Sequence, residues 1–96
     1  MREVLVADQK LVILRFLAEI GGYSSNDSII DDVLSNWSHN ISRDLVRNRI
    51  HWLEEQGLVT VVPLGKTLIA TLTQRGLDVA KGLAYCEGVK RPSPGA

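Results

Sequence analysis

Apolar residues recur along the chain with helical spacing in some stretches and alternate in others. Between about Glu3 or Asp8 and Ile20 the apolar run is nearly continuous, and residues 11–14 cover every direction around one helical turn. Gly21-Gly22 then ends the pattern. A helix that is apolar all round is buried on more than one side, so we expect this helix in the centre of the core, or partly in a dimer interface.

A second helical pattern follows a short polar loop with two possible caps. Either Asn26 caps a helix starting at Asp27, or Ser28 forms a capping box with Asp31. The apolar face of this helix comprises Ile29, Ile30, Val33, Leu34 and Trp37. We expect Trp37 to fill the core at the corner before the next helix.

The third pattern runs from Ser42, the expected N-cap, to Gln56. Its apolar residues Val46, Ile50 and Leu53 lie at i, i+4 and i+7, which places them on one stripe of a helix. The predicted core consists of these three residues with Phe16, Leu17 and Leu34.

After Gly57 the periodicity changes. Residues 58–62 are rich in β-branched side chains, residues 63–66 (Pro-Leu-Gly-Lys) predict a turn, and residues 67–72 predict a return strand. Thr73 is the expected cap of a last helix whose apolar stripe comprises Leu77, Ala80, Leu83 and Ala84. That stripe is expected to pack on the first helix or to pair across a two-fold axis.

This organisation predicts one domain over residues 1–88 and a flexible tail over residues 89–96. The fold class is mainly α with a small β-hairpin: a three-helix core, a two-stranded hairpin and a C-terminal helix. The 96 residues suffice for one core, and 45% of them are hydrophobic, which excludes a disordered chain.

Charge is balanced overall but distributed unevenly. The formal net charge is zero, yet residues 1–40 carry six acidic and three basic side chains, whereas residues 41–75 carry five basic and three acidic ones.

The sequence also bears on the location of the protein in the cell. The single Cys86 favours a reducing compartment. No apolar run reaches about 18 residues, and acidic Glu3 and Asp8 argue against a signal peptide. We therefore expect a cytoplasmic protein that does not enter membranes.

The outer face of the third helix carries side chains suited to nucleic acid. They are Ser42, Arg43, Arg47, Asn48 and His51, and the following hairpin adds Lys66 and Thr67 near its tip. Arginine and asparagine can pair with guanine and adenine through two hydrogen bonds. We expect Arg47 and Asn48 to reach base edges, and Arg43, Lys66 and Thr67 to contact phosphates. The alternative is a solvated face with local charge pairs.

Catalytic and cofactor chemistry find little support. His39 and His51 lie twelve positions apart and far from Cys86, so no zinc-ligand spacing is present. Gly21-Gly22 follows a helix instead of a strand, which argues against a phosphate-binding loop. Asp31 and Asp32 diverge on a helix, a poor geometry for acid–base work. We expect neither an enzyme nor a metal or cofactor protein.

The residues also carry a family resemblance over about residues 8–85. Ser42-Arg43-Asp44, the run from Trp52 to Val59 and the run from Leu72 to Gly76 resemble the recognition helix, wing and following helix of winged helix-turn-helix regulators of the MarR and ArsR types. The same motifs resemble small proteins of Mu-like phages and prophages. The chain lacks the paired cysteines of metal-sensing ArsR-type repressors, so metal sensing is not implied.

Two function classes remain open. The first is a double-stranded DNA-binding protein, a phage, prophage or bacterial transcriptional regulator, with helix 42–56 as recognition helix and hairpin 58–72 as wing. It would act as a homodimer through the first and last helices. The second is a phage accessory or assembly protein that uses the same fold to contact a phage or host protein, because winged helices also serve as protein-binding modules.

Overall fold

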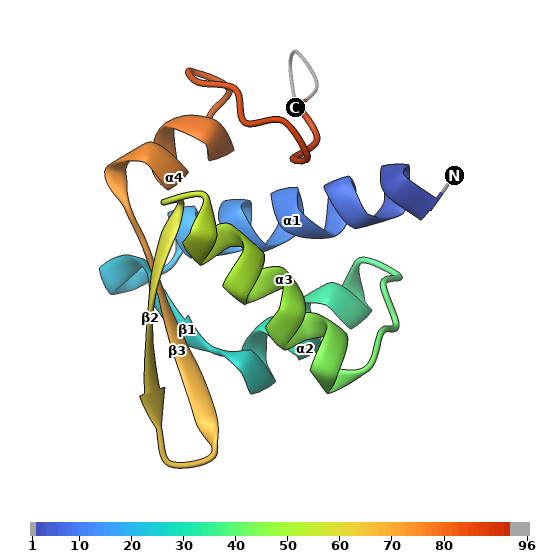
Figure 1. The fold of residues 1–96 in the computed structure, drawn as a ribbon, viewed down its shortest axis with the longest axis vertical. Coiled ribbons are helices and arrows are strands. Elements are labelled where there is room, and N and C mark those ends of the chain that lie inside the picture. The colour runs from blue at the N-terminus through green and yellow to red at the C-terminus, as the bar shows by residue number, and fades with distance from the viewer. Residues whose placement is uncertain (1, 93–96) are drawn as a thin grey trace.

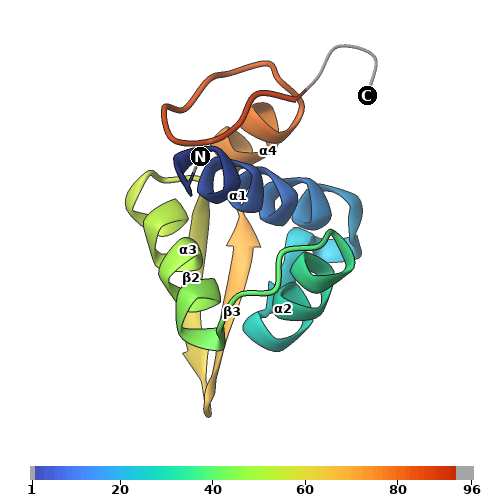
Figure 2. The same cartoon turned by 90° about the vertical axis from the view of Figure 1, so that its right-hand side faces the viewer.

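Helix α1 (Arg2–Glu19) crosses the molecule with α4 (Gln74–Ala80) on one side and α2 (Asp27–Asn36) and α3 (Arg43–Glu55) on the other (Figure 1). The computed structural model describes residues 2–92. The remaining elements in this range are a short 3-10 helix η1 (Gly21–Tyr23) and the strands β1 (Ser24–Asn26), β2 (Val59–Leu64) and β3 (Thr67–Leu72). Seen at right angles, α2 and α3 flank the β2–β3 hairpin below α1 (Figure 2).

The central position predicted for α1 is confirmed over its middle turns. Four consecutive residues, Leu11, Val12, Ile13 and Leu14, are all buried, and so is Leu17. Consecutive residues point in different directions around a helix, so α1 must be covered from several sides. Its contacts with α2, α3, α4 and β3 provide that cover.

The sheet has three strands instead of the predicted two. Residues 24–26, which the sequence indicates to be loop, form β1 and pair antiparallel with β3, giving the strand order β1-β3-β2. Ser24 aligns with Thr71, and their hydroxyls lie 2.9 Å apart. The segment consists of two serines and an asparagine, so it has no apolar alternation by which the sequence could indicate a strand. The fold is thus a mixed α and β arrangement.

Three helix starts match the sequence. The Asn26 side chain accepts a hydrogen bond from the backbone N–H of Ile29 (2.8 Å), which selects Asn26 over Ser28 as the cap of α2. Ser42 caps α3 and Thr73 caps α4 in the same manner. Each cap satisfies a backbone donor that the first helical turn leaves unpaired.

The predicted core is confirmed for five of its six residues: Leu17, Leu34, Val46, Ile50 and Leu53 are completely buried. Phe16 is the exception, because it is only partly buried at the edge of the core.

The expectation for Trp37 is wrong, since it is 66% exposed. Trp37 lies just beyond the last residue of α2, and Ser38 has a positive φ of 66°. The chain therefore leaves the helical path at this point, and the apolar face of α2 does not extend to Trp37. His39 is buried instead.

Strand β3 has the predicted bounds of residues 67–72, whereas β2 begins one residue later and ends two residues later than the predicted residues 58–62. Both strands have six residues, and Leu64 pairs with Thr67 across a tight turn at Gly65-Lys66, where Gly65 has a φ of +60° that favours glycine. Pro63 lies within β2, which is an edge strand. A proline is tolerated there because a missing N–H disturbs no interior ladder.

Helix α4 ends at Ala80, earlier than the predicted stripe requires. Val79 and Ala80 are buried and α4 contacts α1, whereas Leu83 lies beyond the helix and is 76% exposed. The close approach of α4 to the start of β2 depends on Gly76. A Cβ built there would lie 2.7 Å from Leu72 Cδ1 and in collision with the carbonyl oxygen of Leu58.

The segment after α4 folds back over α1 (Figures 1 and 2). The sequence predicts a flexible tail from residue 89, yet Cys86 and Val89 are buried and the Lys90 N–H donates to the Ala7 carbonyl (3.2 Å). The Lys90 ammonium also lies 3.4 Å from an Asp8 carboxylate oxygen. Burial of two apolar side chains and one ion pair thus holds this segment. Residues 93–96 of the predicted tail lie outside the described residues.

Candidate nucleic-acid interface

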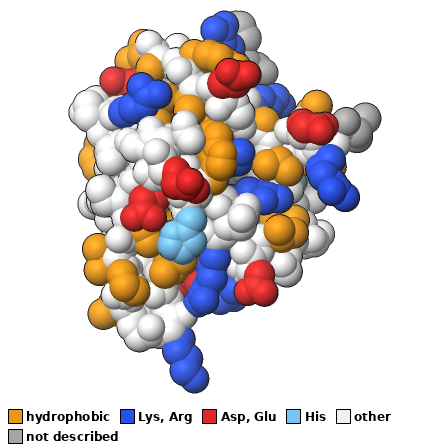
Figure 3. Space-filling view, viewed as in Figure 1, with side chains coloured by type: hydrophobic (Ala, Val, Ile, Leu, Met, Phe, Trp, Pro, Cys, Tyr) orange, Lys and Arg blue, Asp and Glu red, His pale blue; other side chains and the backbone are white. Residues whose placement is uncertain are grey.

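The exposed face of α3 and the tip of the β2–β3 hairpin together carry every residue singled out for nucleic acid. Ser42, Arg43, Asn48 and His51 are exposed on α3 or at its cap, and Lys66 is exposed at the hairpin turn. Arg47 and Thr67 are partly buried. The space-filling view shows basic side chains from the lower end of α3 to the hairpin tip, and acidic ones over the upper end of α3 (Figure 3).

Arg47 is the residue that joins these parts. Its Nε donates to Asp27 Oδ2 over 2.7 Å, and its Nη2 donates to the backbone carbonyl of Lys66. The Arg47 side chain is 38% exposed, but the Asp27 side chain is completely buried. One guanidinium therefore ties α3 both to the first residue of α2 and to the hairpin turn.

Asp27 is charged in a buried place because its partners compensate for the lost solvation. Burial alone would raise the pKa of Asp27, but the hydrogen bonds from Arg47 and from the Leu68 N–H, with the charges of Arg47 and Arg43, hold it below its usual value. Nothing in the sequence indicates this role, since Asp27 occupies a first-turn position where an acidic residue needs no other explanation.

Two further side chains of this face have acidic neighbours. Arg43 Nε donates to Asp31 Oδ2 over 3.0 Å, and His51 Nδ1 lies 3.3 Å from Glu54 Oε1. Both pairs are solvent-exposed, so each holds its side chain only weakly. The Thr67 hydroxyl donates to the Leu64 carbonyl (2.7 Å) and thereby closes the hairpin turn.

The Asn48 amide is hydrogen-bonded to a side chain that also contacts α1. Its Oδ1 accepts a hydrogen bond from Arg49 Nη1 (2.9 Å), and Arg49 Nε donates to Gln9 Oε1 of α1 (2.9 Å). Gln9 is buried, although no motif in the sequence distinguishes it from the residues around it. Burial lowers the pKa of Arg49 from its usual value. These two residues were missed because their pairing spans forty positions.

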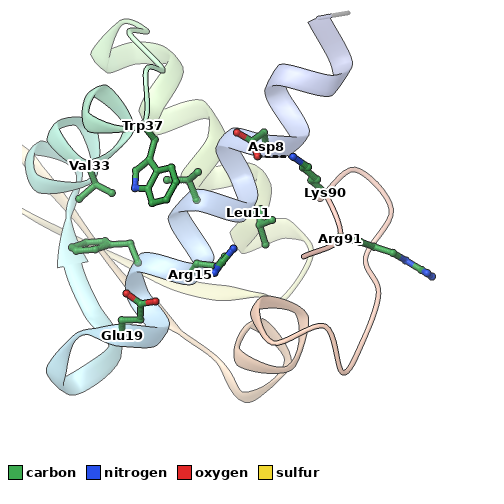
Figure 4. A pocket seen from close by; sticks show the side chains of 10 residues that line it. Asp8, Leu11, Arg15, Glu19, Val33, Trp37, Lys90 and Arg91 are labelled. Atoms are coloured by element: carbon green, nitrogen blue, oxygen red, sulfur yellow. Dashed lines mark ion pairs between the residues drawn. The ribbon is translucent and has the colours of Figure 1, made fainter. Parts of the chain in front are cut away.

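A separate groove of about 390 Å³ runs along α1, between the end of α2 and the C-terminal segment (Figure 4). Phe16 and Trp37 lie at its wall, which accounts for their incomplete burial. Its rim carries the Asp8–Lys90 ion pair, with Arg15 and Glu19 further along α1. The residues lining it are Asp8, Leu11, Val12, Arg15, Phe16, Glu19, Val33, Trp37, Lys90 and Arg91.

Residues 2–92 form neither a metal-binding cluster nor a membrane-spanning helix. No three His, Cys, Asp or Glu side chains in this range lie close enough to hold a metal ion together. Within the same range, no helix combines the length and the apolar content needed to cross a membrane.

Comparison of the sequence with known proteins assigns the chain to a family. No protein-family model matches the chain. The uncharacterized protein gp26 of Escherichia phage Mu is 50% identical over 94 residues, which cover 98% of this chain and 97% of that protein. An uncharacterized protein of Haemophilus influenzae is 51% identical over 94 residues, covering 97% and 89% of the two chains. The resemblance to Mu-like phage proteins is thus confirmed: the chain belongs to the family of phage Mu gp26.

Proposed function

We propose that the protein is a double-stranded DNA-binding regulator of the winged helix-turn-helix type, acting in the cytoplasm of a bacterial host. In this proposal α3 enters the major groove and the β2–β3 hairpin is the wing. The contact between Arg47 and the Lys66 carbonyl supports it most directly, because it holds the hairpin turn against α3. A recognition helix and a wing can engage one duplex only if they keep a fixed relative position.

The proposal gives different roles to the exposed side chains. Asn48 is the main base reader, since its amide can pair with adenine through two hydrogen bonds. Arg43, Lys66 and Ser42 contact phosphates, and His51 lies at the edge of the contact, whereas the Thr67 hydroxyl already donates to the Leu64 carbonyl and holds the turn. Arg47, which the sequence indicates as a base reader, mainly holds α3 and the hairpin turn in their relative position.

The expected affinity is modest. The chain has no net charge, and two cationic phosphate contacts per protomer, Arg43 and Lys66, imply a slope of about −2 for log affinity against log salt. A homodimer would double the contacts and make paired half-sites the natural target.

The proposed dimer uses apolar side chains that the described fold leaves exposed. Val4 and Leu5 are exposed on the first turns of α1, and Leu83 and Tyr85 are exposed after α4. Sedimentation equilibrium at tens of micromolar should give twice the chain mass, whereas a monomer at that concentration would contradict the dimer.

The test of DNA binding is a fluorescence anisotropy titration of a labelled duplex, starting at about 50 mM salt, where electrostatic binding is strong. A duplex selected from a random-sequence pool should bind more tightly than the unselected pool. Asn48→Ala should remove most of that difference, while Asn36→Ala, at the end of α2, serves as the matched control.

A protein-binding role is the second candidate, and one observation favours it. Arg43 and Arg47 are already paired with Asp31 and Asp27, which reduces the charge that the face offers to phosphates. If the wild type binds no duplex at about 50 mM salt, while Asn48→Ala and Lys66→Ala abolish capture of a phage or host protein, this second function replaces the first.

A further inference from the structure

A continuous series of polar side chains runs from α1 beneath α3 to Asn48. We call Asp8, His39, Gln9, Arg49 and Asn48 the polar relay. Its successive distances are 2.7 Å from Asp8 Oδ2 to His39 Nε2, 3.5 Å from His39 Nδ1 to Gln9 Nε2, 2.9 Å from Gln9 Oε1 to Arg49 Nε, and 2.9 Å from Arg49 Nη1 to Asn48 Oδ1.

The two middle members are buried. Gln9 is 5% exposed and His39 is 8% exposed. Burying a polar side chain is costly unless it is hydrogen-bonded, and among residues 2–92 no buried side-chain nitrogen or oxygen lacks a partner. Gln9 and His39 are therefore held in place by the relay itself.

The hydrogen bonds of the relay have a defined order of donors and acceptors, which follows from Arg49. A guanidinium only donates, so the Gln9 atom facing Arg49 must be the amide oxygen. The Gln9 amide nitrogen then faces His39, whose Nδ1 must accept, which leaves Nε2–H to donate to Asp8. Asp8 is in turn anchored by Lys90 on the C-terminal segment.

At its outer end the relay contacts the amide of Asn48. Arg49 Nη1 donates to Asn48 Oδ1, so the oxygen is directed toward Arg49. Within residues 2–92 the Asn48 amide nitrogen has no protein acceptor, so both its donors and the second lone pair of the oxygen are available. Pairing with adenine needs one donor and one acceptor from the same amide in a defined orientation.

We infer that Gln9 is a positioning residue for Asn48: acting through Arg49, it orients the Asn48 amide and so sets the preference for adenine at one position of the target. This inference deepens the proposed function and rests on it for the adenine preference. Ordering a side chain before binding removes part of the entropic cost of association, and for one side chain this corresponds to about a 2–10-fold gain in affinity.

The first experiment needs no DNA. In the wild type, the Asn48 side-chain amide should show NMR chemical shifts and a rigid ¹⁵N relaxation behaviour that differ from those of a free asparagine amide, because Arg49 holds its oxygen. Gln9→Leu keeps the approximate size of the side chain but removes the acceptor for Arg49, and should move these signals toward those of a free asparagine amide. Gln9→Glu keeps an acceptor for Arg49 and should restore them. Unchanged Asn48 signals in Gln9→Leu would overturn the inference.

The second experiment measures selectivity. Binding is compared on the selected duplex and on a duplex in which the adenine sensed by Asn48 is replaced. Gln9→Leu should weaken the first about 2–10-fold and leave the second unchanged, and it should have no further effect in an Asn48→Ala background. An equal loss on both duplexes would show a general structural effect and overturn the positioning role.

Two outcomes separate this inference from the proposed function. If the wild type binds no duplex but Gln9→Leu alters the Asn48 signals, the relay stands and the DNA-binding proposal falls. If Gln9→Leu does not fold, Arg49→Lys replaces it, because lysine keeps the charge but has no planar group to bridge Gln9 and Asn48. Unaltered Asn48 signals in that variant would also overturn the inference.

Discussion

Arg47 and Asp27 form an ion pair across two helices, with Arg47 Nε 2.7 Å from an Asp27 carboxylate that is completely buried. The pair joins the middle of α3 to the first residue of α2, and the same guanidinium contacts the carbonyl of Lys66 in the hairpin turn. The relative position of recognition helix and wing in the proposed function thus depends on a residue that the sequence suggests for base contact.

Removing this guanidinium should destabilise the protein. Arg47→Ala leaves the buried Asp27 carboxylate with only the longer hydrogen bond from the Leu68 N–H, and we expect a loss of roughly 1–3 kcal/mol. Chemical denaturation measures the change. Arg43→Ala is the matched control, since its pair with Asp31 is exposed and should contribute about 0–1 kcal/mol. Equal effects of the two substitutions would contradict a structural role for Arg47.

The Asp27 carboxylate should also make stability depend on pH in a defined window. Its pKa in the folded protein is lowered from 3.8, so its ionised form stabilises the fold above the unfolded pKa. This contribution is lost as the pH falls through the lower, folded pKa. The difference in unfolding free energy between wild type and Asp27→Asn should therefore be constant at neutral pH and shrink below about pH 4. A difference that stays constant down to pH 2 would show that the pair does not stabilise the charged form.

Gly76 should be intolerant of a side chain. A Cβ at this position would collide with the Leu58 carbonyl and lie 2.7 Å from Leu72 Cδ1, so Gly76→Ala must displace α4 from the start of β2. We expect a loss of about 1–3 kcal/mol or more in thermal or chemical unfolding. Gly21→Ala is the control, because a Cβ there meets nothing within 4 Å. A neutral Gly76→Ala would mean that α4 packs less closely than described.

Within the core, Leu53→Ala should cost roughly 2–5 kcal/mol, because the side chain is completely buried between packed elements. Leu45→Ala removes the same atoms from a side chain of α3 that is exposed, and should change stability by only about 0.5 kcal/mol. Thermal melts of the two variants compare a buried and an exposed leucine of one helix. Similar shifts would indicate that α3 is rotated about its axis.

The charge at the hairpin tip should act on all duplexes alike. Lys66→Ala should weaken binding independently of sequence and reduce the slope of log affinity against log salt by about 1. Lys81→Ala removes the same charge from the end of α4 and should leave that slope unchanged. An identical response of both variants would show only a general effect of net charge.

Local features of this protein were determined by the sequence. Ser42 and Thr73 cap the helices that follow them, as expected, because a cap depends on a side chain and a backbone N–H three residues away; for α2 the sequence left Asn26 and Ser28 as alternatives. The buried stripe of Val46 and Ile50 follows from helical periodicity for the same reason: both side chains are placed by one short segment.

Features that join distant segments were decided by the tertiary structure. Strand β1 exists only because β3 offers it a partner across more than forty positions, and Trp37 is exposed because the chain turns away at Ser38. The role of Arg47 depends on Asp27, twenty residues earlier, and the orientation of Asn48 depends on Gln9, thirty-nine residues earlier. Helical spacing places Arg47 on the outer face of α3. Whether its guanidinium contacts solvent or the buried carboxylate of Asp27 depends on how α2 and α3 pack.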